Sequence, residues 1–297
     1  MTAATPTEIF AAERPRLVGL SYRLLGTLAD AEDVVQEAWF RWDAADHAAI
    51  ERPAAWLTTV VSRLGLDRLR ARQRERVDYV GPWLPEPIVA PIMYDEPEHA
   101  AELSDSLTTA FLVMLEELTL EERLVLLLVD VFGEPFRSVA TLLERSEDSC
   151  RQMAVRARRK MGRSPERHAP AKAEQLALAT AFVGAVMSGD VEQVKAMLTP
   201  DAVLTSDGGA RRHAARRPVV GPDRIARFVV NIGRRAVAEG LTFDPVWVNG
   251  RPGVVVSVAG TPYMVTVIEV VGDKIDRYYS ILNPDKLASI GRMVDLV

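Results

Sequence analysis

The sequence has few of the residues that build disulfides, metal sites or membrane segments. It contains one cysteine, Cys150, and 4 scattered histidines among 297 residues, so an internal disulfide is excluded and a structural metal is not expected. Apolar runs such as Leu124 to Val129 are far shorter than the roughly 20 residues that span a bilayer. No basic segment followed by an apolar one lies near Met1, so we expect a cytoplasmic protein without a secretory signal, a membrane segment or a cofactor.

Charge of one sign is missing from long stretches of the chain, although the net charge is only -5. Residues 95–122 contain acids without one Lys or Arg, and residues 151–163 carry six basic residues without an acid. Residues 28–51 are also mainly acidic, whereas residues 63–76 are rich in arginine. This segregation predicts two separate basic contact surfaces.

The composition that remains is typical of a folded protein with more than one domain. Apolar residues make up 48% and charged residues 26% of the chain, and its length is about twice that of an ordinary domain. We expect a helical domain over residues 1–76, a Pro-rich linker over 77–102, a second helical domain over 103–163, a short linker over 164–172 and a third domain over 173–297.

The third domain is predicted to combine helices with a later run of strands. The helical patterns cover residues 173–187, 191–198 and 223–238. Segments rich in Val, Ile and Tyr cover residues 241–248, 254–259, 263–271 and 274–282. Because turn residues such as Asn249-Gly250 separate them, the strands should form an antiparallel meander in an α+β fold.

Residues 120–161 have the pattern of a helix-turn-helix. Two helices over residues 120–131 and 136–143 precede a third helix that Ser146 can cap. On the third helix, small and apolar side chains such as Cys150 and Ala154 share the inward face. The outward face, which a helix-turn-helix lays into the major groove, carries Ser149, Arg151, Gln152, Val155, Arg156, Arg158 and Arg159. The alternative is a basic surface helix in an ordinary bundle.

The helix predicted from Pro53 to Arg74 has an aromatic residue beside a line of arginines. Trp56, Thr59, Arg63, Arg70 and Arg74 share one stripe of this helix. Such a stripe suits single-stranded DNA, because the ring can stack on a base while guanidinium groups hold phosphates. The alternative is that Trp56 belongs to the core, as most tryptophans do.

These segments resemble extracytoplasmic-function (ECF) sigma factors. Asp30-Ala-Glu-Asp-Val-Val-Gln-Glu-Ala-Trp-Phe and the segment from Arg52 to Arg63 look like the second conserved region of that family, and residues 120–128 and 146–159 look like its fourth region. The order and the spacing also match, over residues 8–161. The resemblance implies a bacterial sigma factor that binds core RNA polymerase and promoter DNA.

The resemblance also implies a role for each set of residues. Asp30, Glu32, Asp33 and Glu37 would contact the clamp helices of the polymerase beta-prime subunit, and the second helical domain would contact the beta flap. The Trp56 to Arg74 stripe would bind the minus-ten element, and the outward face of the helix after Ser146 would read the minus-thirty-five element. Asp148 departs from the family, which often has a small residue there.

Three further motifs resemble those of ECF sigma factors with a fused SnoaL-like domain. They are Trp83-Leu-Pro-Glu-Pro, Asp207-Gly-Gly-Ala-Arg and Asn283-Pro-Asp-Lys-Leu. The implied fold is multidomain, with two all-α domains followed by a cone-shaped α+β domain that regulates the sigma factor in cis. Ala210 and Arg211 stand where the subgroup has Gly and Lys. The expected contacts between domains are Trp83, Pro85, Glu86, Asp207, Gly208, Gly209, Asn283, Pro284, Asp285, Lys286 and Leu287.

The local sequence supports two of these expectations. Asn283 is a favourable N-cap, Pro284 suits the first helical turn and Asp285 suits the helix N-terminus, so a short capped helix is predicted there. A tryptophan such as Trp83 in a Pro-rich linker has no core of its own, so we expect it to dock on another surface, with the third domain as one candidate.

Three functions stay open at this point. Beside a sigma factor, the chain could be a DNA-binding regulator whose third domain binds a small molecule, or an enzyme that uses Asp207, His213 or Tyr263 in a pocket. Because nothing pairs these three residues convincingly, and a carboxylate and an aromatic acceptor can be found in most chains, we do not expect an enzyme. The basic stretch from Arg211 to Arg235 could bind an acidic partner or be solvated.

Overall fold

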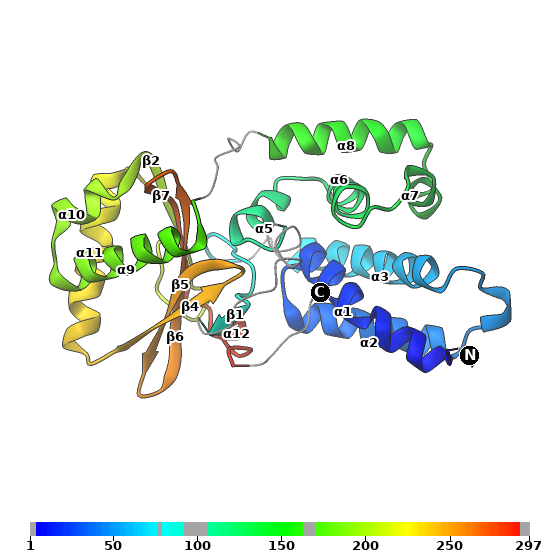
Figure 1. The fold of residues 1–297 in the computed structure, drawn as a ribbon, viewed down its shortest axis with the longest axis horizontal. Helices are drawn as coiled ribbons and strands as arrows, with labels where there is room; N and C mark the ends of the chain where they lie inside the picture. Colours follow the sequence, from blue (N-terminus) through cyan, green and yellow to red (C-terminus); the bar gives the residue numbers. More distant parts are fainter. Residues whose placement is uncertain (1–3, 76–78, 92–105, 163–169, 292–297) are drawn as a thin grey trace. The chain divides into compact units, whose positions relative to one another are not determined.

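The computed structural model describes residues 4–75, 79–91, 106–162 and 170–291 (Figure 1). The chain divides into two compact units. The first contains residues up to 77 together with 112–163, and the second contains residues 78–111 together with 164–293. Among the described residues, no helix combines the length and the apolar composition needed to cross a membrane.

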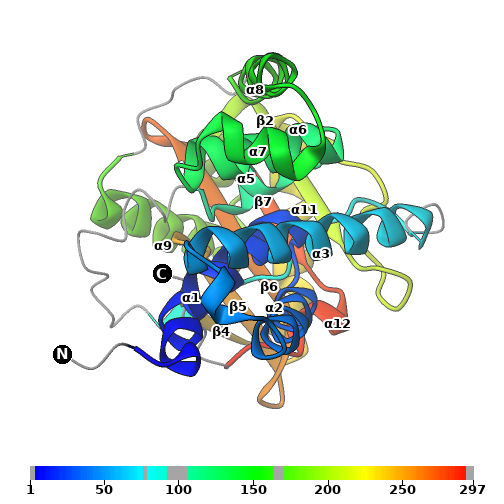
Figure 2. The same cartoon turned by 90° about the vertical axis from the view of Figure 1, so that its right-hand side faces the viewer.

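The first unit begins with three helices, α1 (Pro6–Leu25), α2 (Leu28–Asp43) and α3 (Pro53–Glu75), which pack on one another (Figure 2). A short 3-10 turn over His47–Ala49 lies between α2 and α3. Thr5 caps α1 in a capping box, and Gly26 ends it with a φ of 74° that a residue with a side chain rarely adopts. The core contains fully buried leucines of α1, so the apolar spacing predicted for this domain is confirmed.

The second group of helices consists of α5 (Thr109–Leu115), α6 (Leu120–Leu126), α7 (Phe136–Leu143) and α8 (Glu147–Met161). The boundary between the two units falls within α5. The helix predicted over residues 120–131 is continuous, but its last turn, Leu127–Val131, has π-helical geometry. Ser146 caps α8, as predicted, by accepting a hydrogen bond from the Ser149 backbone N–H at 3.2 Å. Both α6 and α7 pack on α8.

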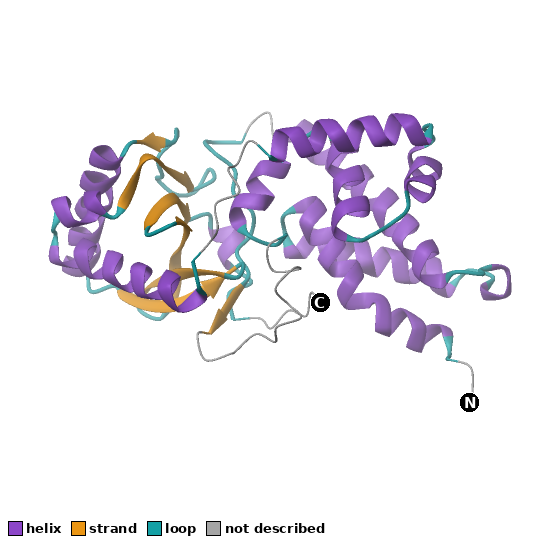
Figure 3. Ribbon diagram, turned by 45° about the horizontal axis from the view of Figure 1, so that its top comes forward, coloured by secondary structure: helices purple, strands orange, loops and turns teal. Residues whose placement is uncertain are grey.

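The second unit is an α+β domain, as predicted (Figure 3). Its helices are α9 (Lys172–Ser188), α10 (Val191–Ala196), α11 (Pro222–Ala238) and α12 (Pro284–Leu287). Its strands are β1 (Val89–Pro91), β2 (Leu198–Asp207), β3 (Val219–Val220), β4 (Thr242–Val248), β5 (Arg251–Val258), β6 (Thr261–Val271) and β7 (Lys274–Ile281). They form one sheet in the order β1-β4-β5-β6-β7-β2-β3.

The predicted meander is present as the antiparallel strands β4 to β7. Asn249 and Gly250 turn the chain between β4 and β5 with φ of 51° and 73°, as their sequence predicts. Two pairings were not predicted. Strand β2 runs parallel to β7, and β1, which comes from the Pro-rich linker, adds to the edge of the sheet beside β4. The core of the domain lies between the helices and the sheet, and it includes Phe182, Ile225 and Ile275.

Candidate DNA-binding surfaces and linker clamp

The outward face of α8 is exposed, whereas its inward face is part of the core. Cys150, Ala154 and Ala157 are fully buried. The predicted contact residues Arg151, Gln152, Val155, Arg156 and Arg159 are exposed, and Ser149 is half-buried. Val155 is an apolar side chain that is 60% exposed. Because the helix leaves these groups in solvent, they are available to a partner.

Two of the exposed arginines are held in place by neighbouring acids. Arg151 forms ion pairs with Glu147 at 2.6 Å and with Asp148 at 2.8 Å, and its guanidinium lies 5.5 Å from the centre of the Phe136 ring. Arg156 pairs with Glu122 of α6 at 3.2 Å. Asp148 therefore orients Arg151, which is the structural consequence of the acid at this position.

Glu122 is a buried carboxylate with several donors. Lys160 donates to its Oε2 at 2.8 Å, and the Thr119 backbone N–H donates to the same oxygen at 3.1 Å. Burial alone would raise the pKa of Glu122, but the hydrogen bonds from Lys160, Thr119 and Arg156 outweigh it and lower that pKa to about 2. The carboxylate thus fixes α8 to α6 while it stays ionised.

The predicted stripe on α3 is partly exposed. Arg63 is exposed and makes no ion pair with the described residues, and Arg70 pairs with Asp67 at 2.9 Å. The Trp56 ring is half-buried, and its centre lies 5.5 Å from the centre of the Trp42 ring. Trp56 therefore combines the two alternatives, with one side in the core and the other in solvent. Thr59 is half-buried and bonds the backbone of its own helix, at Ala55.

The side chain of Arg74, the last predicted residue of this stripe, lies outside the described residues.

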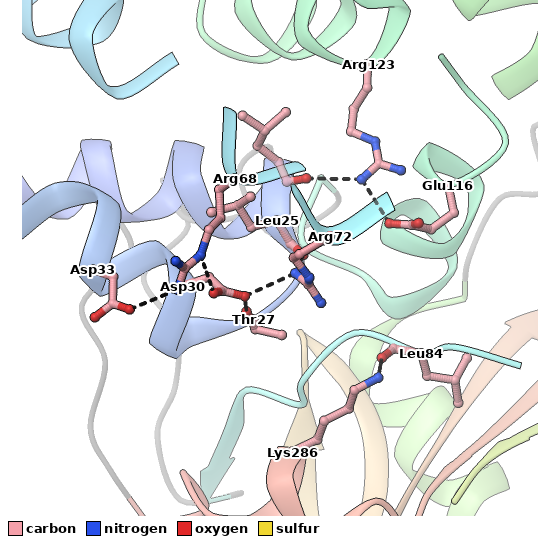
Figure 4. A network of polar contacts seen from close by, with 11 residues as sticks. Leu25, Thr27, Asp30, Asp33, Arg68, Arg72, Leu84, Glu116, Arg123 and Lys286 are labelled. Atoms are coloured by element: carbon pink, nitrogen blue, oxygen red, sulfur yellow. Dashed lines mark hydrogen bonds and ion pairs between the residues drawn. The ribbon is translucent and has the colours of Figure 1, made fainter. Parts of the chain in front are cut away.

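The acidic face of α2 has more basic partners than its own segment suggests. Asp30 accepts hydrogen bonds from Thr27 at 2.5 Å and from Arg68 at 2.9 Å, and it pairs with Arg72 at 3.1 Å (Figure 4). Arg68 also contacts Asp33 at 3.1 Å. These basic partners come from α3 and are distant in sequence, so the acidic composition of residues 28–51 alone does not reveal them.

The four acids that were predicted to contact polymerase differ in their burial. Burial alone would raise the pKa of Asp30, but Thr27, Arg72 and Arg68 lower it below its usual range. The Asp30 side chain is only 19% exposed, compared with 64% for Asp33 and 55% for Glu37. Glu32 is also exposed. Asp30 thus holds α2 to α3, and the other three acids form the accessible face.

A buried arginine that the sequence reading missed joins the two helical groups of the first unit. Arg123 of α6 donates to the backbone oxygen of Leu24 in α1 at 3.0 Å and pairs with Glu116 at 2.8 Å (Figure 4). It is only 3% exposed. The available signal was its position directly before the apolar run of α6, where an arginine needs buried partners.

The described part of the Pro-rich linker, which belongs to the second unit, is held to β2 and α12 of that unit by a buried cluster of polar groups. Asp207, which is fully buried, pairs with Lys286 at 2.5 Å and accepts hydrogen bonds from the Leu84 backbone N–H at 2.8 Å and from the Tyr79 hydroxyl at 2.6 Å. Asn283 donates to the Tyr79 hydroxyl at 2.9 Å. We call these five residues the linker clamp.

Lys286 is the centre of this clamp. Besides Asp207, it donates to the Leu84 backbone oxygen (Figure 4), and its ammonium lies 4.2 Å from the centre of the Trp83 ring. A cation over a ring is attracted by the π electrons. The side chains that follow Leu84, namely those of Pro85 and Glu86, are buried as well. All three resembling motifs thus meet at one place, within one unit.

The glycines and the short helix shape the clamp. A Cβ on Gly209, whose φ is 56°, would lie 2.8 Å from the Asn283 side chain, and a Cβ on Gly208 would collide with the backbone of Arg212. Asn283 caps α12, with Pro284 in its first turn, and Leu287 is buried. Asp285 instead is exposed and pairs with Arg211 at 3.0 Å.

A second contact of the linker was also missed. Asn249, read from the sequence only as a turn residue, bonds Ile88 through its backbone N–H at 2.8 Å and through its side-chain oxygen at 3.1 Å. Its amide group also donates to the Leu107 backbone oxygen at 2.9 Å. Together with the pairing of β1 and β4, this ties the middle of the linker and the segment at Leu107 to the sheet.

The three residues considered for catalysis are not brought into one site. Asp207 belongs to the clamp, His213 is exposed, and the Tyr263 ring is covered by Arg212 at 4.4 Å. Within the described residues, no group of three or more His, Cys, Asp or Glu side chains could hold a metal ion.

Comparison with known proteins gives matches over nearly the whole chain. Residues 9–75 match the model of Sigma-70 region 2, and residues 108–161 match that of Sigma-70 region 4. The ECF RNA polymerase sigma factor SigJ of Mycobacterium tuberculosis is 38% identical over 93% of this chain and 91% of its own. The probable ECF RNA polymerase sigma factor SigI of the same species is 31% identical over 93% and 92%. The crystal structure of SigJ superposes with a TM-score of 0.74 at 36% identity and covers 93% of this chain and 96% of that chain.

Proposed function

The chain belongs to the family of ECF RNA polymerase sigma factors, and we propose that it binds core RNA polymerase in the cytoplasm and directs transcription from promoters of one sequence class. The observation that carries the proposal is the presence of both sigma regions with exposed arginines on α3 and on α8. The side chains of Arg63 and Arg70 on α3 and of Arg151, Arg156 and Arg159 on α8 are exposed, so DNA can reach them.

The minus-thirty-five element is read by the outward face of α8. Arg151 and Arg156 have the geometry that pairs with the O6 and N7 atoms of guanine, and Gln152 suits adenine. Val155 suits the methyl group of thymine, because it is apolar and exposed. Ser149 and Arg159 lie at the N-terminal and C-terminal ends of this face and suit phosphates.

The minus-ten element is bound by α3 as a single strand. The exposed side of Trp56 can stack on a base, and Arg63, Arg70 and Arg74 can hold phosphates. Thr59 lies between them on the same stripe and can bond a base or sugar.

The polymerase is contacted by the accessible acids of α2, which are Glu32, Asp33 and Glu37. Carboxylates at a rim mainly steer association with a basic partner. Asp30 does not belong to this accessible set. It holds α2 against α3 by its ion pairs with Arg68 and Arg72. The region 4 helices contact the beta flap.

The second unit regulates the sigma factor in cis through the linker clamp. A sigma factor must place its two DNA-binding regions at two promoter elements, and the linker between them sets how far they can separate. In the clamped state the linker is bound to β2 and α12 through Asp207 and Lys286. Polymerase or an effector shifts this equilibrium by its higher affinity for one of the two states.

Dependence on polymerase is the test of the proposed function. We expect the full chain with purified core polymerase to transcribe a subset of a promoter library that shares two short elements at fixed spacing. A DNA-binding regulator would instead bind duplex promoter DNA by itself. It would not enable core polymerase to initiate transcription at promoters. Specific duplex binding without any promoter-specific transcription would contradict the proposal.

A further inference from the structure

The second unit contains a cavity that the proposed function does not use. It has a volume of about 70 Å³ and lies between α9, α11 and the sheet. Phe182 of α9, Ile232 of α11 and Leu204 of β2 are among the residues that line it. A water molecule needs about 10 to 15 Å³ of such space, so the cavity holds about five to seven water-sized groups. That is the size of a one-ring molecule or a short chain.

The wall of this cavity is apolar and uncharged. Among its lining residues there is no Asp, Glu, Lys, Arg or His, and the polar side chains are the hydroxyls of Thr266, Tyr278 and Ser280. The hydroxyl groups of Tyr278 and Ser280, two residues apart on β7, and of Thr266, which lies opposite Ser280 on β6, all line the cavity. Burial raises the pKa of the Tyr278 hydroxyl, so it stays protonated. A charged ligand would lose its hydration here without a partner. An uncharged apolar ligand would lose little hydration free energy on entering this cavity.

The same wall lacks the groups that catalysis needs. A general base must titrate near neutral pH and reach the reacting proton, and the cavity offers only hydroxyls. Hydroxyls can, however, bond a carbonyl or hydroxyl oxygen of a ligand and fix its orientation. The chemistry of the wall thus favours binding without reaction.

The cavity and the linker clamp are built on the same two strands. In the parallel pairing of β2 with β7, Leu204 lies opposite Tyr278, and both line the cavity. Three residues further along, Asp207 of the clamp lies opposite Ile281. A group that orders these strands on the cavity side also orders the strand ends that carry the clamp.

We propose that this cavity binds a small uncharged apolar molecule with one hydrogen-bonding oxygen, and that its binding stabilises the linker clamp. The second part of the proposal rests on the proposed control of the sigma factor by the linker. The ligand's hydrocarbon part replaces water along Phe182, Leu204 and Ile232, and its oxygen joins the hydroxyl cluster. The second unit is thereby a sensor of such molecules.

Binding is tested on the full chain with cyclohexanone as the probe and cyclohexanecarboxylate as its charged control. Cyclohexanone should raise the unfolding temperature and shift the methyl NMR signals of lining residues in a saturable way, whereas the carboxylate should do neither. Tyr278→Phe should weaken cyclohexanone binding about tenfold through the loss of one hydrogen bond, but leave toluene binding unchanged.

A pair of variants on α11 locates the site. Ile232 lines the cavity and is 38% exposed, so Ile232→Trp can block it at small cost to folding. Val237 is 47% exposed on the same helix and does not line the cavity, so Val237→Trp is the matched control. Absence of saturable binding, or equal binding by both variants, would overturn the proposal.

The effect on the clamp is read from hydrogen exchange at the Leu84 amide, which is bonded to Asp207. At a cyclohexanone concentration ten times the measured Kd, exchange of this amide should slow up to about tenfold. Unchanged exchange despite saturable binding would overturn the link to the clamp. Failure of the proposed function is separate, since it appears as absent promoter-specific transcription while cyclohexanone still binds.

Discussion

The DNA-binding surfaces of the first unit and the linker clamp of the second unit use their charged side chains in opposite ways. In the first unit, Arg63 is exposed and forms no ion pair within the part of the chain that the structure describes, and Arg151 is 51% exposed in its ion pairs with Glu147 and Asp148. In the second unit, the side chains of Asp207 and Lys286 are 0% and 6% exposed. Exposed ion pairs contribute little to stability, so the arginines can exchange their partners for DNA. A buried pair is stable only with every partner in place, so the linker should dock and release as one unit.

The largest expected effect follows from breaking the buried pair. Asp207→Asn leaves the Lys286 charge without a counter-ion, and the loss of one partner of a buried pair typically costs about 3 to 5 kcal/mol. We expect this loss in urea unfolding, or as release of the linker and fast exchange of the Leu84 amide. Asp285→Asn is the matched control, because its pair with Arg211 is exposed. It should cost less than about 0.5 kcal/mol, and equal losses in both variants would contradict the contrast.

A smaller effect is expected from Glu122, a buried carboxylate whose basic partners Arg156 and Lys160 are 48% and 39% exposed. Its pKa of about 2 in the folded protein is below the usual 4.5, so the carboxylate stabilises the fold above pH about 4.5, and this contribution is lost as the pH falls toward 2. Glu122→Gln should cost about 2 to 3 kcal/mol at pH 7 and nearly nothing at pH 2. Urea unfolding of both proteins across this pH range is the measurement. A constant difference between them would show that the charge is not responsible.

Replacement of the exposed arginines should affect promoter use more than folding stability. Arg151→Ala or Arg156→Ala is expected to weaken promoter use by about 1 to 3 kcal/mol and to relax the preference at one position of the minus-thirty-five element. Folding stability should change little for Arg151→Ala, because its ion pairs are exposed. Transcription from promoters altered at single positions tests this. Unchanged activity and unchanged preference in both variants would remove α8 as the reading helix.

The acids of α2 give the smallest expected effect on stability and a clear one on binding. Reversal of charge at Asp33 and Glu37 together should reduce affinity for core polymerase, because both side chains are more than half exposed. The double variant should remain folded by circular dichroism. Unreduced binding to core polymerase by the folded variant would show that this face is only solvated.

How far the sequence predicts this structure depends on the distance between partners along the chain. The Ser146 cap, the exposed face of α8 and the Asn249-Gly250 turn arise from neighbouring residues, and these predictions are confirmed. The resemblance to ECF sigma factors with a fused α+β domain is confirmed too. The Arg68 to Asp30 contact, by contrast, was missed because 38 residues separate its partners.

The clamp was only partly predictable for the same reason. Trp83 in a Pro-rich segment indicated that the linker docks, and the three motifs indicated where. Tyr79 and the pairing of β1 with β4 gave no local signal, because an extended segment with prolines has no periodicity that reveals a strand. The ion pair of Asp207 with Lys286 joins residues 79 positions apart.

Promoter-specific transcription with purified core polymerase tests the central claim most directly. The comparison is between the full chain, Trp83→Ala, Lys286→Met and a chain that ends before Asn283, with Asp285→Asn as the control. Because the first two variants and the truncation weaken the clamp, we predict that each raises transcription several-fold, whereas the control matches the wild type. Equal transcription by all five proteins would contradict regulation through the linker clamp.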